Sequence, residues 1–437
     1  LVNEILVKKE CYIQGLWGSS PAFFISSLAH NITTGNKRTI LFITPKIEEA
    51  EEAYEDFKTF FTGEVLYFPV VDEIISQESQ YDYETKVHQL RVLYKILKNK
   101  GIGTSLNQII VTPVQALMQK VPLPQDIEGN VLTIRAGKNC DSAILQNWLL
   151  KGGFERTRMV ELPGEFSLRG GIFDIFPHTS EKPYRIEFFG DEVESIRTFH
   201  TDTQLTEKKV SECELLGVQI DAGNTPACQS TDSQREERIV NSTNDRKDEL
   251  FRSEGGFPSL FDYIPAGSWI VFKEYDDIEN RITTLSTNMK SQTNSITLDH
   301  IMESCNGMTK VFVTRSPLKR EGVHSFSVKE PDQLDKDATV SVKKIKEMSL
   351  AQNHTLIFCS NEAEKQRLCD LLSGCGSSIE PSQKRLRSGQ KENGEIFSSD
   401  HIEFHIGNLN HGFIFEDISL AFLTHHEIFS RYQLRRD

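Results

Sequence analysis

The feature that most constrains the fold is a run of short alternating segments between residues 154 and 199. Phe166 and Leu168 alternate there with the polar residues Ser167 and Arg169. Successive side chains of a β-strand point to opposite faces, so this alternation predicts strands with one buried face. The same pattern returns at Tyr184, Ile186 and Phe188. The segment therefore predicts a small sheet joined by tight turns.

Glycines mark the turns of this sheet. We expect Gly170-Gly171 to interrupt the first strand, as a bulge or as a close approach of two backbones. Gly190-Asp191 predicts a tight hairpin turn. The mostly apolar segment 172–176 is expected to be buried, and the segment 177–183 is expected to be a loop.

Three residues stand out on the polar side of these strands. Arg169, Arg185 and Phe189 all fall on faces opposite the apolar stripe. Arginine and aromatic side chains are the types that anchor protein interfaces. The alternative is that the arginines are ordinary surface charges and that Phe189 packs under a loop. Spacing alone leaves both interpretations open.

Strands and helices alternate in the first 121 residues, which predicts an open α/β sheet. Buried strands are expected at 39–44, 65–68 and 108–112, and helices at 47–60 and 83–98. From about residue 122 the pattern changes, which indicates a small inserted α+β module that contains the segment described above. We expect four regions: 1–121, the inserted module at 122–204, 205–335 with a mobile polar loop at 221–248, and a small α/β domain at 336–437.

The turn after the first strand has the spacing of a phosphate-binding loop. Such a loop needs glycines, a lysine that meets the phosphate charge, and a serine or threonine that holds magnesium. Here the lysine position is Pro21 and the hydroxyl position is Ala22. The loop shape is expected to persist without its chemistry, and the alternative is an ordinary Gly-Ser turn before a helix. The residues concerned are Gly15, Gly18, Ser19, Ser20, Pro21 and Ala22.

Two other segments are compared with catalytic or binding motifs. A nucleotide hydrolase ends one strand in Asp-Glu, whereas this chain has Lys273-Glu274, whose lysine would repel magnesium. The basic cluster Lys384, Arg385, Arg387 and Lys391 could touch phosphate, although a solvated loop is the simpler interpretation. We therefore predict no catalytic residue and no cofactor site in this segment.

Composition narrows the class of partner. The chain has 437 residues and a net charge of −14, and an acidic chain repels nucleic-acid phosphates, which argues against DNA as the main partner of this region. No apolar run approaches the roughly 20 residues of a membrane span, so no membrane partner is expected. The chain starts with Leu1 rather than Met, so we expect a piece of a longer protein.

Cysteine and histidine usage predicts no metal site. The 8 cysteines form no CxxC pair, which favours reduced, buried thiols in a cytoplasmic protein. His425-His426-Glu427 lacks the second histidine of the HExxH zinc motif.

Several stretches carry a resemblance to a known family, the bacterial transcription-repair coupling factors (the Mfd family). The chain resembles the N-terminal part of that family, which is itself similar to UvrB, the damage-loading subunit of the nucleotide-excision nuclease. The resemblance covers nearly the whole chain in the family's order. The matching stretches are GLWGSSPAF, TPVQALMQKVP, LPGEFSLRGGIFDIFP, PYRIEFFGDEVESIRTF followed by TDTQLT, LFDYIPAGSWIVF, and NLNHGFIF with FLTHHEIF.

The resemblance implies an α/β fold: a degenerate P-loop, helicase-like domain with the inserted α+β module and a C-terminal small α/β domain. It implies that the module binds the damage-sensing subunit UvrA, through positions matching Arg169, Arg185 and Phe189. Arg158, Glu165 and Glu187 would line the rim. ATP and magnesium would belong to motor modules outside this segment, and RNA polymerase and DNA would bind there too. The family also leads us to expect that C-terminal modules mask the UvrA surface.

We therefore favour a non-catalytic adaptor that recruits UvrA to RNA polymerase stalled at DNA damage, within a factor resembling an ATP-dependent DNA translocase. On this hypothesis Arg185→Ala abolishes capture of UvrA and leaves the melting temperature unchanged. The alternative is a UvrB-like repair protein that binds nucleotide or damaged DNA. The span from Asp72 to the expected helix is too short for UvrB's damage-opening hairpin, which disfavours the DNA-binding form.

Overall fold

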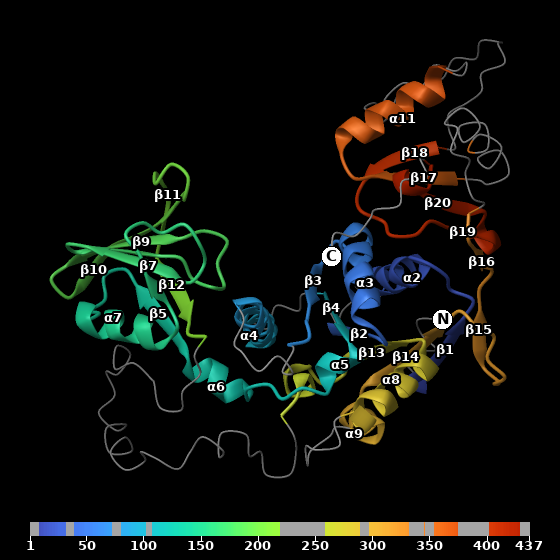
Figure 1. The fold of residues 1–437 in the computed structure, drawn as a ribbon, viewed down its shortest axis with the longest axis horizontal. Coiled ribbons are helices and arrows are strands. Elements are labelled where there is room, and N and C mark those ends of the chain that lie inside the picture. The colour runs from blue at the N-terminus through green and yellow to red at the C-terminus, as the bar shows by residue number, and fades with distance from the viewer. Residues whose placement is uncertain are drawn as a thin grey trace.

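The computed structural model describes residues 8–31, 39–71, 80–101, 107–218, 258–288, 297–331, 345, 354–374 and 402–428. These residues form a parallel α/β domain, a β-rich module that projects from it, and a second, smaller α/β domain (Figure 1). The expected mobile loop 221–248 and the basic cluster Lys384, Arg385, Arg387 and Lys391 lie outside the described residues. Among the described helices, none has both the length and the apolar character needed to cross a membrane.

The first domain is built on a 7-stranded sheet in the order β15-β1-β14-β13-β2-β4-β3, and every pairing in it is parallel. Its strands are β1 (Glu10–Gln14), β2 (Thr39–Thr44), β3 (Glu64–Tyr67), β4 (Gln108–Pro113), β13 (Trp269–Lys273), β14 (Thr309–Thr314) and β15 (Val323–Ser325). Residues on both sides of the inserted module therefore complete one sheet, as the expected open α/β fold requires.

Helices cover both faces of this sheet. Phe42 of β2 packs toward helices α2 and α3, whereas its neighbours Leu41 and Ile43 pack toward the opposite helices. Burial on both faces explains why the central strands are apolar along their whole length. The helices are α2 (Ser20–Asn31), α3 (Ile47–Phe60), α4 (Gln80–Gly101), α5 (Val114–Leu117), α8 (Tyr275–Asn288) and α9 (Leu298–Ser304), with a 3₁₀ turn at Leu260–Tyr263.

The inserted module combines helices α6 and α7 with a 6-stranded sheet, ordered β11-β10-β9-β8-β7-β6, and with the pair β5–β12. Asp141 begins α7, because its carboxylate accepts hydrogen bonds from the N–H groups of Ala143 and Ile144. The elements are α6 (Pro124–Gly129), β5 (Val131–Arg135), α7 (Ser142–Lys151), β6 (Glu155–Arg156), β7 (Glu165–Arg169), β8 (Ile172–Ile175), β9 (Tyr184–Phe189), β10 (Glu192–Phe199), β11 (Thr206–Val210) and β12 (Glu212–Leu216).

The module extends beyond residue 204, where the sequence placed its end. Strand β11 pairs with β10, and β12 returns antiparallel to β5 at the base of the module. Strand β11 is mostly exposed, so its sequence carries little of the alternation that marks a half-buried strand, whereas β12 buries Cys213, Leu215 and Leu216 but is only 5 residues long. The pairing of β5 with β12 brings the two ends of the insertion together.

Gly170-Gly171 forms the two-residue turn between β7 and β8, rather than a bulge. Arg169 pairs directly with Ile172 across this turn. The expected close approach is present at Gly171, where a β-carbon would lie 3.0 Å from the carbonyl oxygen of Phe188. The expectation that all of 172–176 is buried is wrong at Ile172, which is 37% exposed at the turn. The hairpin at Gly190-Asp191 is confirmed.

The second α/β domain has a 5-stranded sheet in the order β16-β19-β20-β17-β18. It begins with β16, before the expected boundary at residue 336, because β16 pairs with β19. Its elements are β16 (Val328–Lys329), β17 (His354–Cys359), α11 (Glu362–Gly374), β18 (Ile402–Ile406), β19 (Phe413–Phe415), a 3₁₀ turn (Glu416–Ile418), β20 (Leu420–Thr424) and α12 (His425–Ile428).

Helix α4 lies between the module and the parallel sheet and contacts the base of the module (Figure 1). The Tyr83 hydroxyl donates a hydrogen bond to the carbonyl oxygen of Gly153 at 3.2 Å. His178 of the module is 4% exposed, and its ring centroid lies 4.9 Å from that of Phe154. Burial, together with the nearby charge of Arg91 on α4, lowers the pKa of His178 to about 4.

We predict that His178 makes the protein less stable in mild acid. Its folded pKa lies below the ordinary value of 6.5, so between these values the unfolded chain binds a proton that the folded chain does not. Stability is therefore lost as the pH falls from 7 toward 4, by about 2 kcal/mol at pH 5. Urea unfolding at pH 7 and pH 5 should show a smaller acid loss for His178→Gln than for the unaltered chain.

The matched control for this prediction is His200→Gln, because His200 is a half-exposed histidine of the same module. Its acid loss should equal that of the unaltered chain. An equal loss in all three proteins would contradict the assignment of the effect to His178.

Candidate protein-binding surface

The strand register defines which residues of the module face outward. Residues paired directly across antiparallel strands lie on the same face of a sheet. One cross-strand row is apolar and packs toward helix α7: Leu168, Phe173, Ile186 and Ile196. The two rows on the opposite face are Arg169, Ile172, Glu187 and Ser195, and Ser167, Asp174, Arg185 and Arg197. We call this second face the outer face.

Arg169, Arg185 and Phe189 all lie on the outer face, as their spacing predicted. Arg185 and Phe189 are four residues apart on β9, with Glu187 between them. Arg169 lies in the same cross-strand row as Glu187. The three side chains nevertheless have different surroundings, so they cannot act in the same way.

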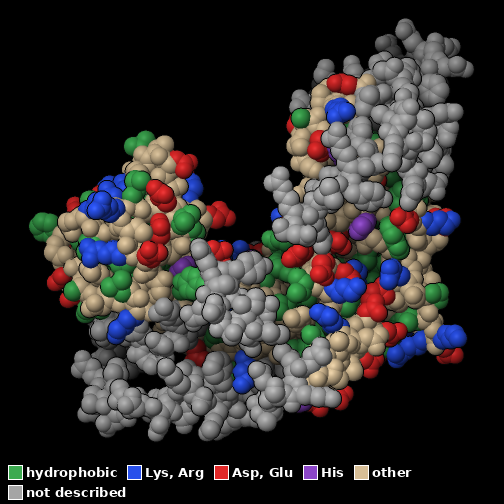
Figure 2. All heavy atoms as spheres, viewed as in Figure 1, with side chains coloured by type: hydrophobic (Ala, Val, Ile, Leu, Met, Phe, Trp, Pro, Cys, Tyr) green, Lys and Arg blue, Asp and Glu red, His purple; other side chains and the backbone are tan. Residues whose placement is uncertain are grey.

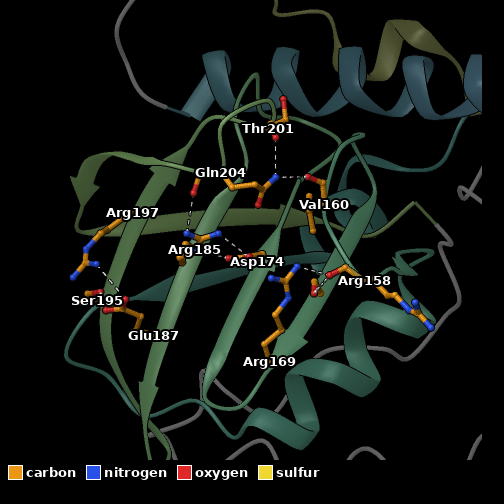
Figure 3. A network of polar contacts seen from close by, with 11 residues as sticks. Arg158, Val160, Arg169, Asp174, Arg185, Glu187, Ser195, Arg197, Thr201 and Gln204 are labelled. Atoms are coloured by element: carbon orange, nitrogen blue, oxygen red, sulfur yellow. Dashed lines mark hydrogen bonds and ion pairs between the residues drawn. The ribbon is translucent and has the colours of Figure 1, made fainter.

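Arg185 is built into the module. Its Nε and Nη2 atoms donate hydrogen bonds to the two oxygens of Asp174, at 2.7 and 2.9 Å. Its Nη1 donates to the carbonyl oxygen of Gln204 at 3.1 Å (Figure 3). Its guanidinium also lies over the ring of Phe199. The hydrogen bond with Asp174 raises the pKa of Arg185 above its ordinary value. Because 20% of the Arg185 side chain is exposed, it offers a partner only one edge of the guanidinium.

Arg169 is exposed at the end of β7, beside the strand's turn. Its Nη2 donates a hydrogen bond to the carbonyl oxygen of Arg158, and the hydroxyl of Ser167 donates to the same oxygen at 3.1 Å. The side chain of Arg158 extends away from Arg169 (Figure 3). The two guanidiniums therefore present separate positive charges to solvent.

The two predicted rim carboxylates have structural partners. Glu165 accepts hydrogen bonds from the backbone N–H groups of Glu161 and Leu162, at 2.7 and 2.9 Å. Glu187 accepts from the hydroxyl of Ser195 at 2.7 Å and from Arg197 at 3.1 Å. These bonds fix the shape of the outer face.

Phe189 is 79% exposed at the tip of the β9–β10 hairpin. The alternative interpretation, that this ring packs under a loop, is wrong. A large apolar side chain exposed to this degree on a rigid strand is the kind of anchor that protein interfaces use.

Three exposed apolar residues near these strands were not predicted. They lie on connecting segments, where no strand or helix period applies. The only sequence signal was their position: Leu162 is in the stretch LPGEF, Leu205 is in TDTQLT, and Met159 lies shortly before LPGEF. Hydrophobic, basic and acidic side chains are mixed on the visible face of the module (Figure 2). The three residues are Met159 at 45%, Leu162 at 65% and Leu205 at 67% exposure.

The turn between β1 and α2 is the other candidate site. Gly15 and Gly18 have φ values of +85° and +58°, in the region that favours glycine. A cavity of about 210 Å³ opens beside this turn, and Pro21, Lys273 and Glu274 contribute to its lining. Lys273 pairs with Glu49 at 3.0 Å, and the Glu274 carboxylate accepts from the Thr314 hydroxyl at 2.9 Å. That this turn is a phosphate-binding loop without its chemistry stays a prediction, which depends on Pro21 and Ala22 at the lysine and hydroxyl positions.

Comparisons with known proteins agree with these features of the chain. The family of the UvrB interaction domain matches residues 132–219, which are the module from β5 to just past β12. A transcription-repair-coupling factor of Bacillus subtilis is 34% identical over 197 residues, which cover 45% of this chain and 16% of that protein. Two from Staphylococcus aureus, strains RF122 / ET3-1 and USA300, are each 23% identical across 100% of this chain.

The chain spans 39% of the length of these two Staphylococcus aureus relatives. It is therefore similar, along its whole length, to the N-terminal part of proteins named transcription-repair-coupling factors. The comparison covers the parallel domain, the module and the small α/β domain together.

We predict that Arg185→Ala destabilises the module by about 3 kcal/mol, because it leaves the carboxylate of Asp174 buried without its cation. This prediction differs from the expectation of an unchanged melting temperature, because Arg185 is paired with the buried Asp174. Urea unfolding measures the change. The control Lys182→Ala breaks an exposed pair with Glu207 and should change stability by less than about 1 kcal/mol. Equal effects of the two substitutions would contradict the structural role of Arg185.

Proposed function

We propose that this chain is a non-catalytic docking adaptor in transcription-coupled repair, whose module recruits UvrA through its outer face. The observation that carries the proposal is the exposed ring of Phe189, which lies at the same end of the sheet as the exposed Arg169. The match of residues 132–219 to the UvrB interaction domain supports a repair protein as the partner.

The internal bonds of the outer face suit a docking role. Binding is weakened when side chains and loops must be ordered at the interface. Here Arg185 ties β9 to β8 and to the segment around Gln204, and Glu165 fixes the turn that carries Leu162. A partner would therefore meet a surface whose backbone is already held in place.

The rest of the proposed activity concerns the whole factor. We propose that parts of the factor outside this chain bind RNA polymerase and DNA, and that they use ATP and magnesium to move along DNA. C-terminal parts would mask the outer face until the factor reaches stalled polymerase. This chain would then supply the repair contact within such a factor.

The alternative, a UvrB-like protein that binds nucleotide or damaged DNA, has less support. The cavity beside the β1–α2 turn is lined by more acidic than basic side chains. Like charges weaken binding to a triphosphate or to a nucleic-acid backbone. The adaptor therefore remains the better account of this chain.

We predict that Phe189→Ala and Arg169→Ala each weaken capture of UvrA by roughly 30-fold, which is about 2 kcal/mol for an interface anchor. Both residues are exposed, so the folded state should be unaffected. Calorimetric titration of UvrA measures the affinity, and urea unfolding checks the fold. The control Leu150→Ala removes an exposed apolar side chain from α7, on the opposite side of the module's sheet. Full affinity in both outer-face variants would overturn the proposal.

We also predict no saturable heat when ATP and magnesium are titrated into the chain. The lining of the cavity, with its excess of carboxylates, gives the physical reason. A gel shift with damaged duplex should likewise disappear at physiological salt. Micromolar nucleotide binding, or a shift that survives such salt, would favour the UvrB-like alternative.

A further inference from the structure

A loop of the small α/β domain lies directly on the β1–α2 turn of the first domain. We call residues 407–412 (GNLNHG) the joint loop. The backbone N–H of His411 donates a hydrogen bond to the hydroxyl of Ser19 at 3.1 Å. A β-carbon on Gly18 would lie only 3.1 Å from the β-carbon of His411. The joint loop therefore covers the turn whose spacing resembles a phosphate-binding loop.

Helix α3 supplies the other side of this contact. Asn410 donates two hydrogen bonds to Oδ1 of Asp56, from its backbone N–H at 2.9 Å and from its side-chain Nδ2 at 3.0 Å. The same Nδ2 reaches the carbonyl oxygen of Glu52 at 2.8 Å. The hydroxyl of Thr59 donates to the carbonyl oxygen of Asn408 at 2.6 Å. Successive turns of α3, at Glu52, Asp56 and Thr59, thus form hydrogen bonds with backbone and side-chain groups of the joint loop.

Asp56 is the centre of this contact because it is a carboxyl group with 4% exposure. Burial raises its pKa to about 6, and hydrogen bonds from Asn410 and Ser19 oppose that shift. A buried carboxylate is tolerated only when it has hydrogen-bond donors. Ser19 donates from the domain of Asp56 itself, whereas both Asn410 donors come from the joint loop, so Asp56 loses those two hydrogen bonds if the domains separate.

The exit of the joint loop is fixed by the second half of the NLNHGF…FLTHHE pattern. Glu427 accepts hydrogen bonds from the N–H groups of Gly412 and Thr424, at 2.8 and 3.0 Å. A β-carbon on Gly412 would lie 2.3 Å from the Glu427 carboxylate, so only glycine fits there. Glu427 belongs to the His-His-Glu segment that the sequence analysis compared with a zinc motif. Here it holds the end of the joint loop by a hydrogen bond to Gly412.

We propose that the β1–α2 turn and Asp56 form a peptide receptor whose ligand is the joint loop of the same chain, and that this contact sets the position of the small domain. The function of the turn would then be to hold two domains together rather than to bind phosphate. A ligand approaching Gly18 from the side of the joint loop would first have to displace His411. This inference does not depend on what the outer face of the module binds.

Hydrogen–deuterium exchange of the full chain tests the proposal. The substitutions are Asp56→Ala, on the receptor side, and Asn410→Ala, on the ligand side. Asn410 lies on an exposed loop, so its substitution should leave the protein folded. In both variants, peptides covering 408–412 and 17–20 should exchange at least about 10-fold faster. Peptides from the module, 131–218, should not change.

The matched control is Glu55→Ala, which removes the neighbouring carboxylate of α3. Glu55 pairs with Lys58 near solvent at 3.1 Å. Its substitution should therefore leave exchange at 408–412 unchanged. Unchanged exchange in Asn410→Ala would overturn the proposal, because the domains would then be held by their apolar contacts alone. Faster exchange at 408–412 without any change at 17–20 would also overturn it, since the turn would not be part of the receptor.

Discussion

One hydrophobic core continues from the first domain into the small α/β domain, and the arrangement of both depends on it. Phe42 and Phe57 of the first domain belong to the same cluster of buried side chains as Phe413 and Phe422. The ring of Phe23 on α2 lies 4.7 Å from that of Phe422. Separating the domains would expose these rings to water, at roughly 25 cal/mol for each Å² of apolar surface. The polar contacts of the joint loop then fix the register of surfaces that the apolar core holds together.

The outer face of the module shows how a sheet can be both stable and available for binding. Arg185 and Asp174 neutralise each other in the interior of the face, so the charge of that pair is largely used within the module. Arg169 and Phe189 lie at strand ends beside turns and are exposed, and no element within the described part of the chain covers them. Stability and the proposed recognition would therefore rest on different residues of the same face. A contact surface assigned from residue type alone would have treated both arginines as equivalent.

The sequence predicted elements whose pattern is local. Helix α3 and strand β2 are where the sequence pattern placed them, because the spacing of their own apolar side chains determines them. The same reasoning failed where a distant partner decides. The module's end depends on β12 returning to β5, and the burial of Arg185 depends on Asp174 and Gln204. The exposure of Leu162 and Leu205 depends on how their connecting segments pack against the module. The spacing of apolar residues in the sequence does not predict that packing.

The electrostatics of the cavity beside the β1–α2 turn connect the two proposals. Each of the three basic side chains lining it has a carboxylate partner: Lys273 with Glu49, Arg315 with Glu274, and His411 with Glu52. The Glu52 carboxylate, 3.8 Å from the imidazole, also raises the pKa of His411. A triphosphate could gain these cations only by breaking the pairs and leaving the carboxylates beside its own charges. The joint loop forms part of the cavity wall through His411 and leaves all three pairs intact, so the cavity as built accommodates the loop and disfavours a nucleotide.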